Sequence, residues 1–437
     1  MERGNRVTTE KAFTLQNAVL IDPKENFEGM GSLTIEDGVI TSVNGKSKGN
    51  EIDCQGFYIA PGIIDIGVKI CEPGEQHKES FKSAGASAAA GGITTMVTRP
   101  DTNPPIDNPE ILEFFLRRAE QATDVRVIPM AALSKNLDGK ELTEMVFLCN
   151  KGAIALTDGF KQVSDPKIFL NAMKYASDLD ALIVAHPQDH ALSLGTAATS
   201  GKFATLQGIP SVSTIAEKLG IDRDIILAEE SGVRYHADQI TTKNALISIR
   251  AAKKRGIKLT AGTSIHHLIL NEFDIANYRT FFKLSPPLRS EVDREAIVQG
   301  LVDQTLDTIS SFHSPQDEES KRLPFQVAAS GAVGLQTLLP ACLKLVHNGY
   351  IDLPQLFQFI SFNPANILGI SGGSLAKNCA ANIIIFDKDA PFVMDRFKLF
   401  SKSKNTPFDE MTMQGKVLNT IVNGKTIYRD KQRGIKI

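Results

Sequence analysis

The feature that most constrains the fold is an alternation between short apolar runs and helical patterns in the middle of the chain. Eight runs have the length and composition of buried strands, and helical patterns separate most of them. Eight strands that alternate with helices predict an α/β fold with a (β/α)8 barrel, formed by residues 59–377. In such a barrel the chemistry sits where each strand runs into the following loop. The candidate strands are residues 63–70, 93–98, 125–132, 153–157, 181–185, 233–238, 257–262 and 306–310.

One helix start is marked clearly. Residues 108–110 (Asn-Pro-Glu) offer a capping side chain, a first-turn proline and a first-turn acid. Ile111, Phe114 and Phe115 follow at a spacing that predicts one apolar stripe on this helix.

Both ends of the chain are rich in strand patterns. Residues 32–43 hold two alternating runs around the turn signal Glu-Asp-Gly, which predicts a hairpin. Near the other end, residues 382–387 and 417–428 also have strand patterns, and Asn-Gly at 423–424 is a turn signal. The two ends therefore differ from the helix-rich middle.

Composition excludes several classes of protein. The 437 residues are 42% hydrophobic and 22% charged, with a net charge of −2, so neither nucleic acid nor an anionic membrane is an expected partner. No apolar run is long enough to cross a membrane, and the charged first 15 residues do not resemble a secretory signal. The five cysteines are widely separated, which predicts reduced thiols in a cytoplasmic protein.

Several segments together resemble one enzyme family. Residues 61–74 (PGIIDIGVKICEPG) resemble the dihydroorotase branch of the amidohydrolase family, and further matches follow in order over nearly the whole chain. The string at 401–408 (SKSKNTPF) favours dihydroorotases over hydantoinases or allantoinases. The resemblance implies that residues 1–58 and 378–437 pair into one small β-sandwich domain beside the barrel. The further matching segments are residues 88–104, 222–232, 282–301 and 361–370.

The resemblance implies a zinc-dependent reaction. The family interconverts dihydroorotate and carbamoyl-aspartate by hydrolysing or closing a cyclic amide. One or two zinc ions activate a hydroxide by lowering the pKa of bound water to about 7. The ligands come from the ends of several strands.

This chain departs from the family at four of the six metal-ligand positions. The two histidines after the first strand are replaced by Gly67, which has no side chain, and Lys69, whose ammonium has no lone pair. The histidine after the sixth strand falls on Gln239, and the last aspartate, which also moves the proton, falls on Phe312. No catalytic acid or base is therefore expected.

Two ligand positions match the family, the acid at Asp158 and the histidine at His186. No cofactor is expected from this set, although these two residues together could bind a single weak zinc ion.

The substrate-binding positions have changed as well. The family's arginine falls on Cys71, one asparagine falls on Asp101, and another falls on Ser285. The first two changes remove a cation and add a negative charge where carbamoyl-aspartate carries two carboxylates. Metal and substrate determinants have therefore been lost together.

Local charge pairs are expected to replace the metals. We expect the ammonium of Lys69 to pair with the carboxylate of Asp158, with Phe312 filling the vacated volume, because a buried unpaired carboxylate is costly. A solvated Lys69 is the alternative. Arg99, which stands where the family has an apolar residue, is expected to pair with Asp101.

Three functions are compatible with these residues. The first is a pseudoenzyme of pyrimidine biosynthesis that acts as a structural or regulatory partner of aspartate carbamoyltransferase, a role that the resemblance implies, with a homodimer as the expected state. The second is a working dihydroorotase or related zinc cyclic amidohydrolase. The third is a metal-free small-molecule binding protein, in which Lys69 would bind an anion or act as a base if its pKa fell.

Overall fold

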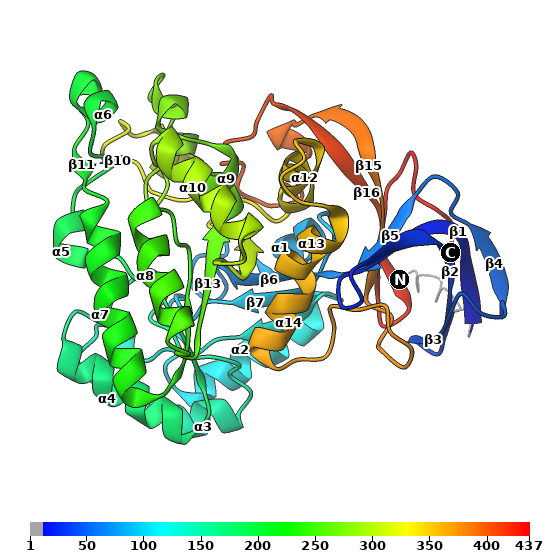
Figure 1. The fold of residues 1–437 in the computed structure, drawn as a ribbon, viewed down its shortest axis with the longest axis horizontal. Helices are drawn as coiled ribbons and strands as arrows, with labels where there is room; N and C mark the ends of the chain where they lie inside the picture. The colour runs from blue at the N-terminus through cyan, green and yellow to red at the C-terminus, as the bar shows by residue number, and fades with distance from the viewer. Residues whose placement is uncertain (1–11) are drawn as a thin grey trace, which may run out of the picture.

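The computed structural model describes residues 12–437, and a barrel of parallel strands lies at its centre (Figure 1). Residues 1–11, which belong to the expected terminal domain, lie outside the described residues. Seven of the eight predicted barrel strands are confirmed, most of them shorter than expected. They are β6 (Ile63–Val68), β7 (Ile93–Thr98), β8 (Arg126–Pro129), β9 (Leu182–Ala185), β12 (Arg234–Ala237), β13 (Leu259–Ser264) and β14 (Thr308–Ser310).

The predicted strand at 153–157 is wrong as a strand, because this segment forms only isolated bridges. Leu156 bridges Ala131 on one side and Ile183 on the other, so it still joins the sheet β6-β7-β8 to the sheet β9-β12-β13-β14. Ile154 donates its N–H to the carbonyl of Pro129 (3.0 Å), but Pro129 has no N–H of its own. The N–H of Ala131 then donates to the carbonyl of Ala155 (3.0 Å), so Pro129 leaves out one bond of a short ladder.

The ring of strands closes between its first and last members. The N–H of Lys69 donates to the carbonyl of His313 (2.9 Å) just past the ends of β6 and β14. The buried carboxylate of Asp65, in the middle of β6, accepts the N–H of Ser311 (2.8 Å) and also its hydroxyl. Burial raises the pKa of Asp65 to about 6, against the opposing effect of the Ser311 hydrogen bonds.

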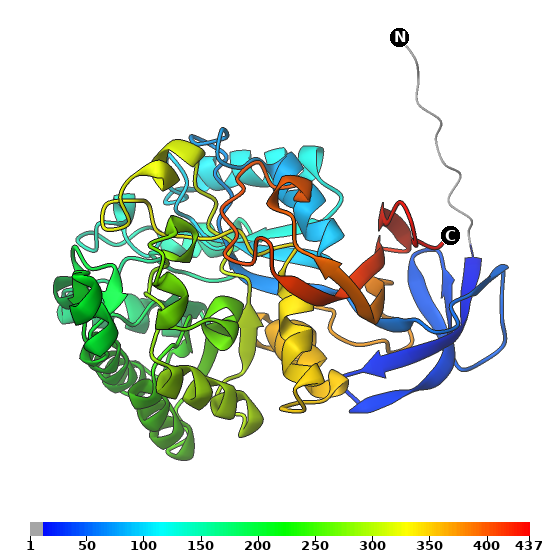
Figure 2. The same ribbon diagram turned by 90° about the horizontal axis from the view of Figure 1, so that it is seen from above.

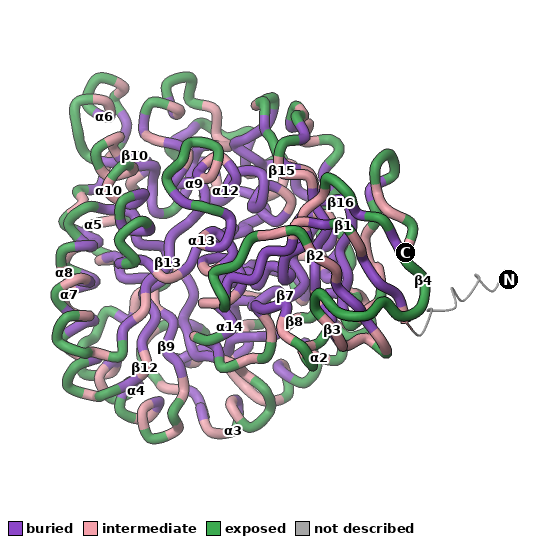
Figure 3. The backbone as a smooth tube through the Cα atoms, turned by 45° about the vertical axis from the view of Figure 1, so that its right-hand side comes forward, coloured by how far each residue is buried: buried purple, intermediate pink, exposed green. Residues whose placement is uncertain are grey.

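The helices wrap the barrel, and Figure 3 shows exposed residues along their outer sides as well as in the surface loops. The predicted start of α2 is confirmed, since Asn108 caps the helix by accepting the N–H of Ile111 (3.0 Å). The predicted stripe is partly wrong: Phe115 is buried, whereas Phe114 is exposed, and Leu112 takes its place. The longer helices are α1 (Phe81–Ala90), α2 (Pro109–Ala122), α4 (Pro166–Asp178), α7 (Ile215–Ser231), α8 (Lys243–Lys254), α10 (Glu291–Val302) and α12 (Leu338–His347).

Shorter elements fill the connections between the barrel strands and follow the last helix. The short α-helices are α3 (Met145–Asn150), α5 (His190–Ser193), α6 (Lys202–Gln207), α9 (Ile265–Ile269), α11 (Glu318–Arg322), α13 (Leu353–Phe357) and α14 (Asn363–Leu368). The remaining short elements are η1 (Lys135–Leu137), η2 (Glu272–Ile275), η3 (Thr280–Phe282), η4 (Gln358–Phe362), η5 (Arg396–Lys398), β10 (Ala198–Thr199) and β11 (Ser211–Val212). Within residues 12–437, no helix has both the length and the apolar character needed to cross a membrane.

The two ends of the chain meet in one hydrogen-bonded sheet beside the barrel (Figures 1 and 2). Its order is β17-β16-β15-β5-β1-β2-β3, and β4 pairs with β1. Both predicted hairpins are confirmed: Asp37-Gly38 and Asn423-Gly424 turn with positive φ at both residues, as this type of hairpin requires. The strands are β1 (Ala12–Asp22), β2 (Phe27–Glu36), β3 (Val39–Val43), β4 (Asn50–Asp53), β5 (Tyr58–Pro61), β15 (Ile383–Val393), β16 (Thr412–Val422) and β17 (Lys425–Arg429).

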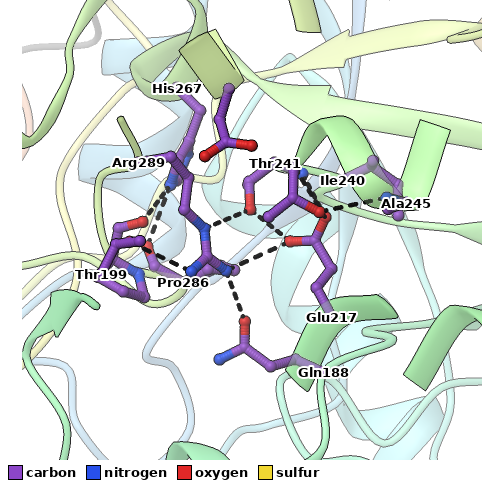
Figure 4. A network of polar contacts seen from close by, with 12 residues as sticks. Gln188, Thr199, Glu217, Ile240, Thr241, Ala245, His267, Pro286 and Arg289 are labelled. Atoms are coloured by element: carbon purple, nitrogen blue, oxygen red, sulfur yellow. Dashed lines mark hydrogen bonds and ion pairs between the residues drawn. The ribbon is translucent and has the colours of Figure 1, made fainter. Parts of the chain in front are cut away.

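A buried ion pair links the loops around the barrel mouth, where the strands end (Figure 4). Arg289 donates through Nε to the hydroxyl of Thr241 (2.9 Å) and through Nη2 to Gln188 (3.1 Å) and Glu217 (3.4 Å). Glu217 in turn accepts the N–H groups of Thr241 and Thr242, both at 2.9 Å. Every charge in this network is compensated, so it fixes loops that follow three different strands.

Removing the charge of Glu217 tests this network. Glu217→Gln leaves Arg289 without its counter-charge and turns an amide donor toward backbone N–H groups, so we expect the free energy of unfolding to fall by about 3 kcal/mol. Glu229→Gln, which removes an exposed partner of Arg255, is the control and should change it by less than about 0.5 kcal/mol. Urea denaturation measures both; equal small losses would contradict the role of the network.

Candidate functional site

The candidate site lies at the barrel mouth, where the sequence places the family's metal positions. The structure brings two of these positions, Gly67 and Phe312, against a single side chain, that of Arg99. His186 packs against Phe160, whose ring lies over the same guanidinium. Arg99 directly follows β7 and points into the space between the strands. Lys69 and Asp158 have partners of their own, whereas Oε1 of Gln239 has no hydrogen-bond partner among the described residues.

The guanidinium of Arg99 is enclosed by aromatic rings. Its Cζ lies 3.6 Å from the ring centroid of Phe160 and 5.0 Å from that of Phe312, and the side chain is only 1% exposed. Its nearest counter-charge is Asp238, at 4.0 Å. Gly67 leaves room for it, because a Cβ at that residue would lie 3.1 Å from Nη2 of Arg99. A fixed cation therefore lies beside two of the predicted metal positions, Gly67 and Phe312.

The expected pairing of Arg99 with Asp101 is wrong. The three guanidinium nitrogens have no hydrogen-bond partner among the described residues, and Asp101 is held by another cation. Burial lowers the pKa of Arg99, while Asp238 acts to raise it. Phe160 and Asp238 are functional neighbours that sequence reasoning missed. The available signal was an arginine at an apolar position of the family, together with an acid directly before Gln239.

The expected pairing of Lys69 with Asp158 is also wrong. Nζ of Lys69 lies 3.0 Å from the carboxylate of Asp101 and 3.9 Å from that of Glu75. Although burial acts to lower the pKa of Lys69, Asp101 and Glu75 hold it above its ordinary value. Lys69 is therefore an ammonium that is already paired, which makes it unsuited to act as a base or to form a Schiff base.

Asp158 is occupied by its own neighbours. One carboxylate oxygen accepts the N–H groups of Leu133 (3.0 Å) and Ser134 (2.9 Å), and the other accepts the hydroxyl of Ser134 (2.5 Å). Three donors satisfy the carboxylate without any cation, which is why Lys69 does not need to reach it. Burial still raises the pKa of Asp158 above its ordinary value.

His186 faces Asp238 and the ring of Phe160. Its Nδ1 lies 3.4 Å from Oδ1 of Asp238, and the two rings meet edge to face with centroids 5.7 Å apart. His186 and Asp158 both border one small cavity of about 10 Å3, which is the size of about one water molecule. Asp158 and His186 are therefore close to one another, and the cavity that they share is small.

Gln239 and Phe312 keep an unusual backbone. Both residues have positive φ values, 50° and 45°, which is uncommon for side chains other than glycine, asparagine and aspartate. Phe312 is buried, as expected for a residue that fills volume, and it lies over Arg99. Gln239 is buried as well, and its Oε1 has no hydrogen-bond partner among the described residues.

The former substrate positions offer no free cation. Cys71 is buried, and burial raises the pKa of its thiol to about 12. Asp101 is neutralised by Lys69, and Ser285 is exposed in the loop before Pro286. None of these three side chains can take over the role of an arginine that binds a carboxylate.

The family's 401–408 segment is anchored beside the mouth. Glu79, at the start of α1, accepts the hydroxyl of Ser401 and the N–H of Lys402 (3.3 Å), and it faces Nε2 of His313 at 3.3 Å. Although burial acts to raise the pKa of Glu79, His313 and Ser401 hold it below its ordinary value. This segment therefore has a structural task that does not require a metal.

Of the side chains at the six positions, only those of Asp158 and His186 are donors that zinc takes. A zinc ion takes thiolate, neutral imidazole or carboxylate donors, and glycine, an ammonium and a phenyl ring supply none of these. Within residues 12–437, no three His, Cys, Asp or Glu side chains converge in a group that could hold a metal ion. Two cations, Arg99 and Lys69, are present instead.

The barrel, the sheet from both chain ends and the polar positions at the strand ends define an amidohydrolase-type fold. Solved structures agree: an L-hydantoinase (dihydropyrimidinase) from Arthrobacter aurescens superposes with a TM-score of 0.87 at 22% identity, covering 97% of each chain. A D-hydantoinase gives a TM-score of 0.84, also at 22% identity. At this identity the likeness concerns the fold alone.

Sequence comparison narrows the family. A family model described as dihydro-orotase-like matches residues 56–245. A dihydroorotase from Syntrophus aciditrophicus is 37% identical over 95% of this chain and 99% of its own length. One from Aquifex aeolicus is 34% identical over 95% and 99%, respectively. The chain belongs to the dihydroorotase family.

A pair of glycine substitutions tests whether Arg99 requires the space at Gly67. Gly67 (φ +91°) and Gly56 (φ +82°) both have left-handed backbones, but a Cβ on Gly56 would meet nothing within 4 Å. We expect Gly67→Ala to lower the free energy of unfolding by about 2–3 kcal/mol and Gly56→Ala by only about 1 kcal/mol. Urea denaturation provides both values, and equal losses would show that Arg99 is not crowded.

Proposed function

We propose that this dihydroorotase-family protein lacks hydrolase activity and serves as a structural or regulatory partner of aspartate carbamoyltransferase in pyrimidine biosynthesis. The observation that carries the proposal is the Arg99 guanidinium, which lies against Gly67 and Phe312 in the barrel mouth. A fixed positive charge at this place opposes the binding of a divalent cation.

The substrate argument supports the same proposal. Carbamoyl-aspartate carries two carboxylates and needs cations that are free to bind it. Lys69 is paired with Asp101, and Cys71 is an uncharged thiol. Arg99 is enclosed by Phe160 and Phe312 and is closed to solvent, so an anion does not reach it without a rearrangement of these rings.

A zinc-dependent dihydroorotase is the second candidate. It is favoured by relatives named dihydroorotase at 34–38% identity and by the two retained residues, Asp158 and His186, which border the same small cavity. It requires further ligands and the removal of Arg99 from the space between the strands. The raised pKa of Lys69 argues against the third function, metal-free catalysis by this amine.

Zinc content and cyclisation rate, measured on one preparation, test the loss of activity. We expect far less than one zinc per chain and no cyclisation of carbamoyl-aspartate above the rate without protein. The dihydroorotase from Syntrophus aciditrophicus, prepared in the same way, is the positive control. Stoichiometric zinc together with turnover that a chelator abolishes would overturn the proposal in favour of the second candidate.

Assembly with aspartate carbamoyltransferase is tested separately. A barrel whose mouth has lost its chemistry remains a stable scaffold, because the packed core and the mouth loops are largely separate. We expect this chain, a homodimer by itself, to co-elute with aspartate carbamoyltransferase of the same organism in size-exclusion chromatography. Separate elution at micromolar concentrations, with unchanged transferase kinetics, would contradict the partner role. It would not bear on the proposed loss of hydrolase activity.

A further inference from the structure

A second cavity lies outside the barrel mouth described above. Its volume is about 770 Å3, within the range of small-molecule sites. Loops that follow the last two barrel strands form it: residues 278–281, which include the start of η3, and residues 318–326, which include α11. Arg396 of η5 completes the wall.

Positive charge dominates the lining. Arg279, Lys321, Arg322 and Arg396 line the cavity, whereas Glu318 is the single carboxylate among the lining residues. Glu318 pairs with Arg322 at 2.9 Å, and both are well exposed. The other three cations have only one further carboxylate within 4 Å among the described residues, and a chain with a net charge of −2 has no general excess of cations.

Two of the arginines share that carboxylate. Asp409 lies 2.5 Å from Arg279 and 3.5 Å from Arg396, so one negative charge compensates two positive ones. The two guanidinium groups also lie over the same ring, that of Phe281, at 5.0 and 5.2 Å. The ring and Asp409 hold the arginines in place while leaving an uncompensated charge.

Lys321 contributes a buried ammonium without any carboxylate. It is 4% exposed, and its Nζ donates to the carbonyls of Thr280 (3.0 Å) and Lys283 (3.4 Å). Lys283 is 6% exposed, and its own Nζ donates only to the carbonyl of Gln326 (2.7 Å). Two neighbouring buried ammonium groups that lack a counter-ion are costly, and an anion would remove that cost.

We propose that this cavity binds a small phosphorylated anion through Lys321, Arg279, Arg322 and Arg396. Guanidinium groups match the fork of phosphate oxygens, and an ammonium adds a point charge. Tyr278 and Phe325 supply aromatic surface at the same cavity, which suits a phosphorylated compound that carries a ring. The site does not depend on the loss of activity in the mouth, because none of these residues takes part in the mouth contacts.

Isothermal titration with inorganic pyrophosphate tests the site on the full chain. We expect a dissociation constant of about 1 mM or tighter, weakened at least about tenfold by Lys321→Met, which removes the buried charge. Lys344→Met is the control: Lys344 is half-buried, does not line the cavity and should leave the affinity unchanged. Arg322→Ala changes an exposed residue, so it should have little effect on folding. It should weaken binding at least about threefold, which corresponds to the loss of one exposed ion pair.

Titration with ATP distinguishes a nucleotide site from a site that recognises the phosphate groups alone. Tighter binding of ATP than of pyrophosphate assigns the site to a nucleotide, and equal binding assigns it to the phosphate groups alone. The absence of heat and of a melting-temperature shift with both probes would overturn the proposal, as would equal binding by the Lys321→Met variant.

The pH dependence gives an independent readout. Burial and the neighbouring Lys283 lower the pKa of Lys321 to about 7, and the other charges that face it are Arg279, Arg322, Arg396 and Glu318. An anion binds the ammonium, so the affinity for sulfate, whose charge is constant in this range, should fall between about pH 6 and pH 8 as Lys321 loses its proton. The Lys321→Met variant should show no such fall; an unchanged profile would exclude Lys321 from the site.

Discussion

The architecture of the barrel mouth depends on one buried cation between two aromatic rings. The guanidinium of Arg99 lies over Phe160 and beside Phe312, with Asp238 as its nearest counter-charge. Two substitutions become consistent with each other once this cation is considered: Gly67 leaves room for it, and Phe312 covers it. Asp238, the nearest acid, has the cation as its counter-charge. A single long side chain that enters the mouth thus accounts for residues that appear unrelated along the sequence.

The buried charges away from Arg99 belong to the scaffold. Asp65 holds the last strand through Ser311, Glu79 holds the 401–408 segment, and Arg289 with Glu217 joins the loops in between. In each case hydrogen bonds satisfy the charge within the protein, which fixes loops at small net cost. The conformation of the mouth loops therefore rests on contacts other than those of the predicted metal positions.

The sequence predicted the elements better than the contacts of the site. Alternation and turn chemistry identified seven barrel strands, the start of α2 and both hairpins, because these depend on local patterns. The segment 153–157 could not be distinguished from a strand by its pattern, since it does pair with a neighbour on each side and only the length of the pairing falls short. The partners of Lys69 and Arg99 were wrong because long side chains choose among several acids, and which acids are already satisfied depends on folded loops such as 133–134 around Asp158.

The backbone at the former ligand positions shows how far the mouth is determined by its loops. Gln239 and Phe312 have positive φ values that cost about 1–3 kcal/mol each. Neighbouring contacts impose this path: the N–H of Ile240 donates to the carbonyl of Gly262 (2.8 Å), and the N–H of His313 donates to Ser311 (3.1 Å). Because hydrogen bonds of the following residues hold both turns, this backbone does not depend on a contact of the Gln239 or Phe312 side chain. The geometry at the strand ends is therefore a property of the barrel, whereas its chemistry depends on the side chains that the geometry presents.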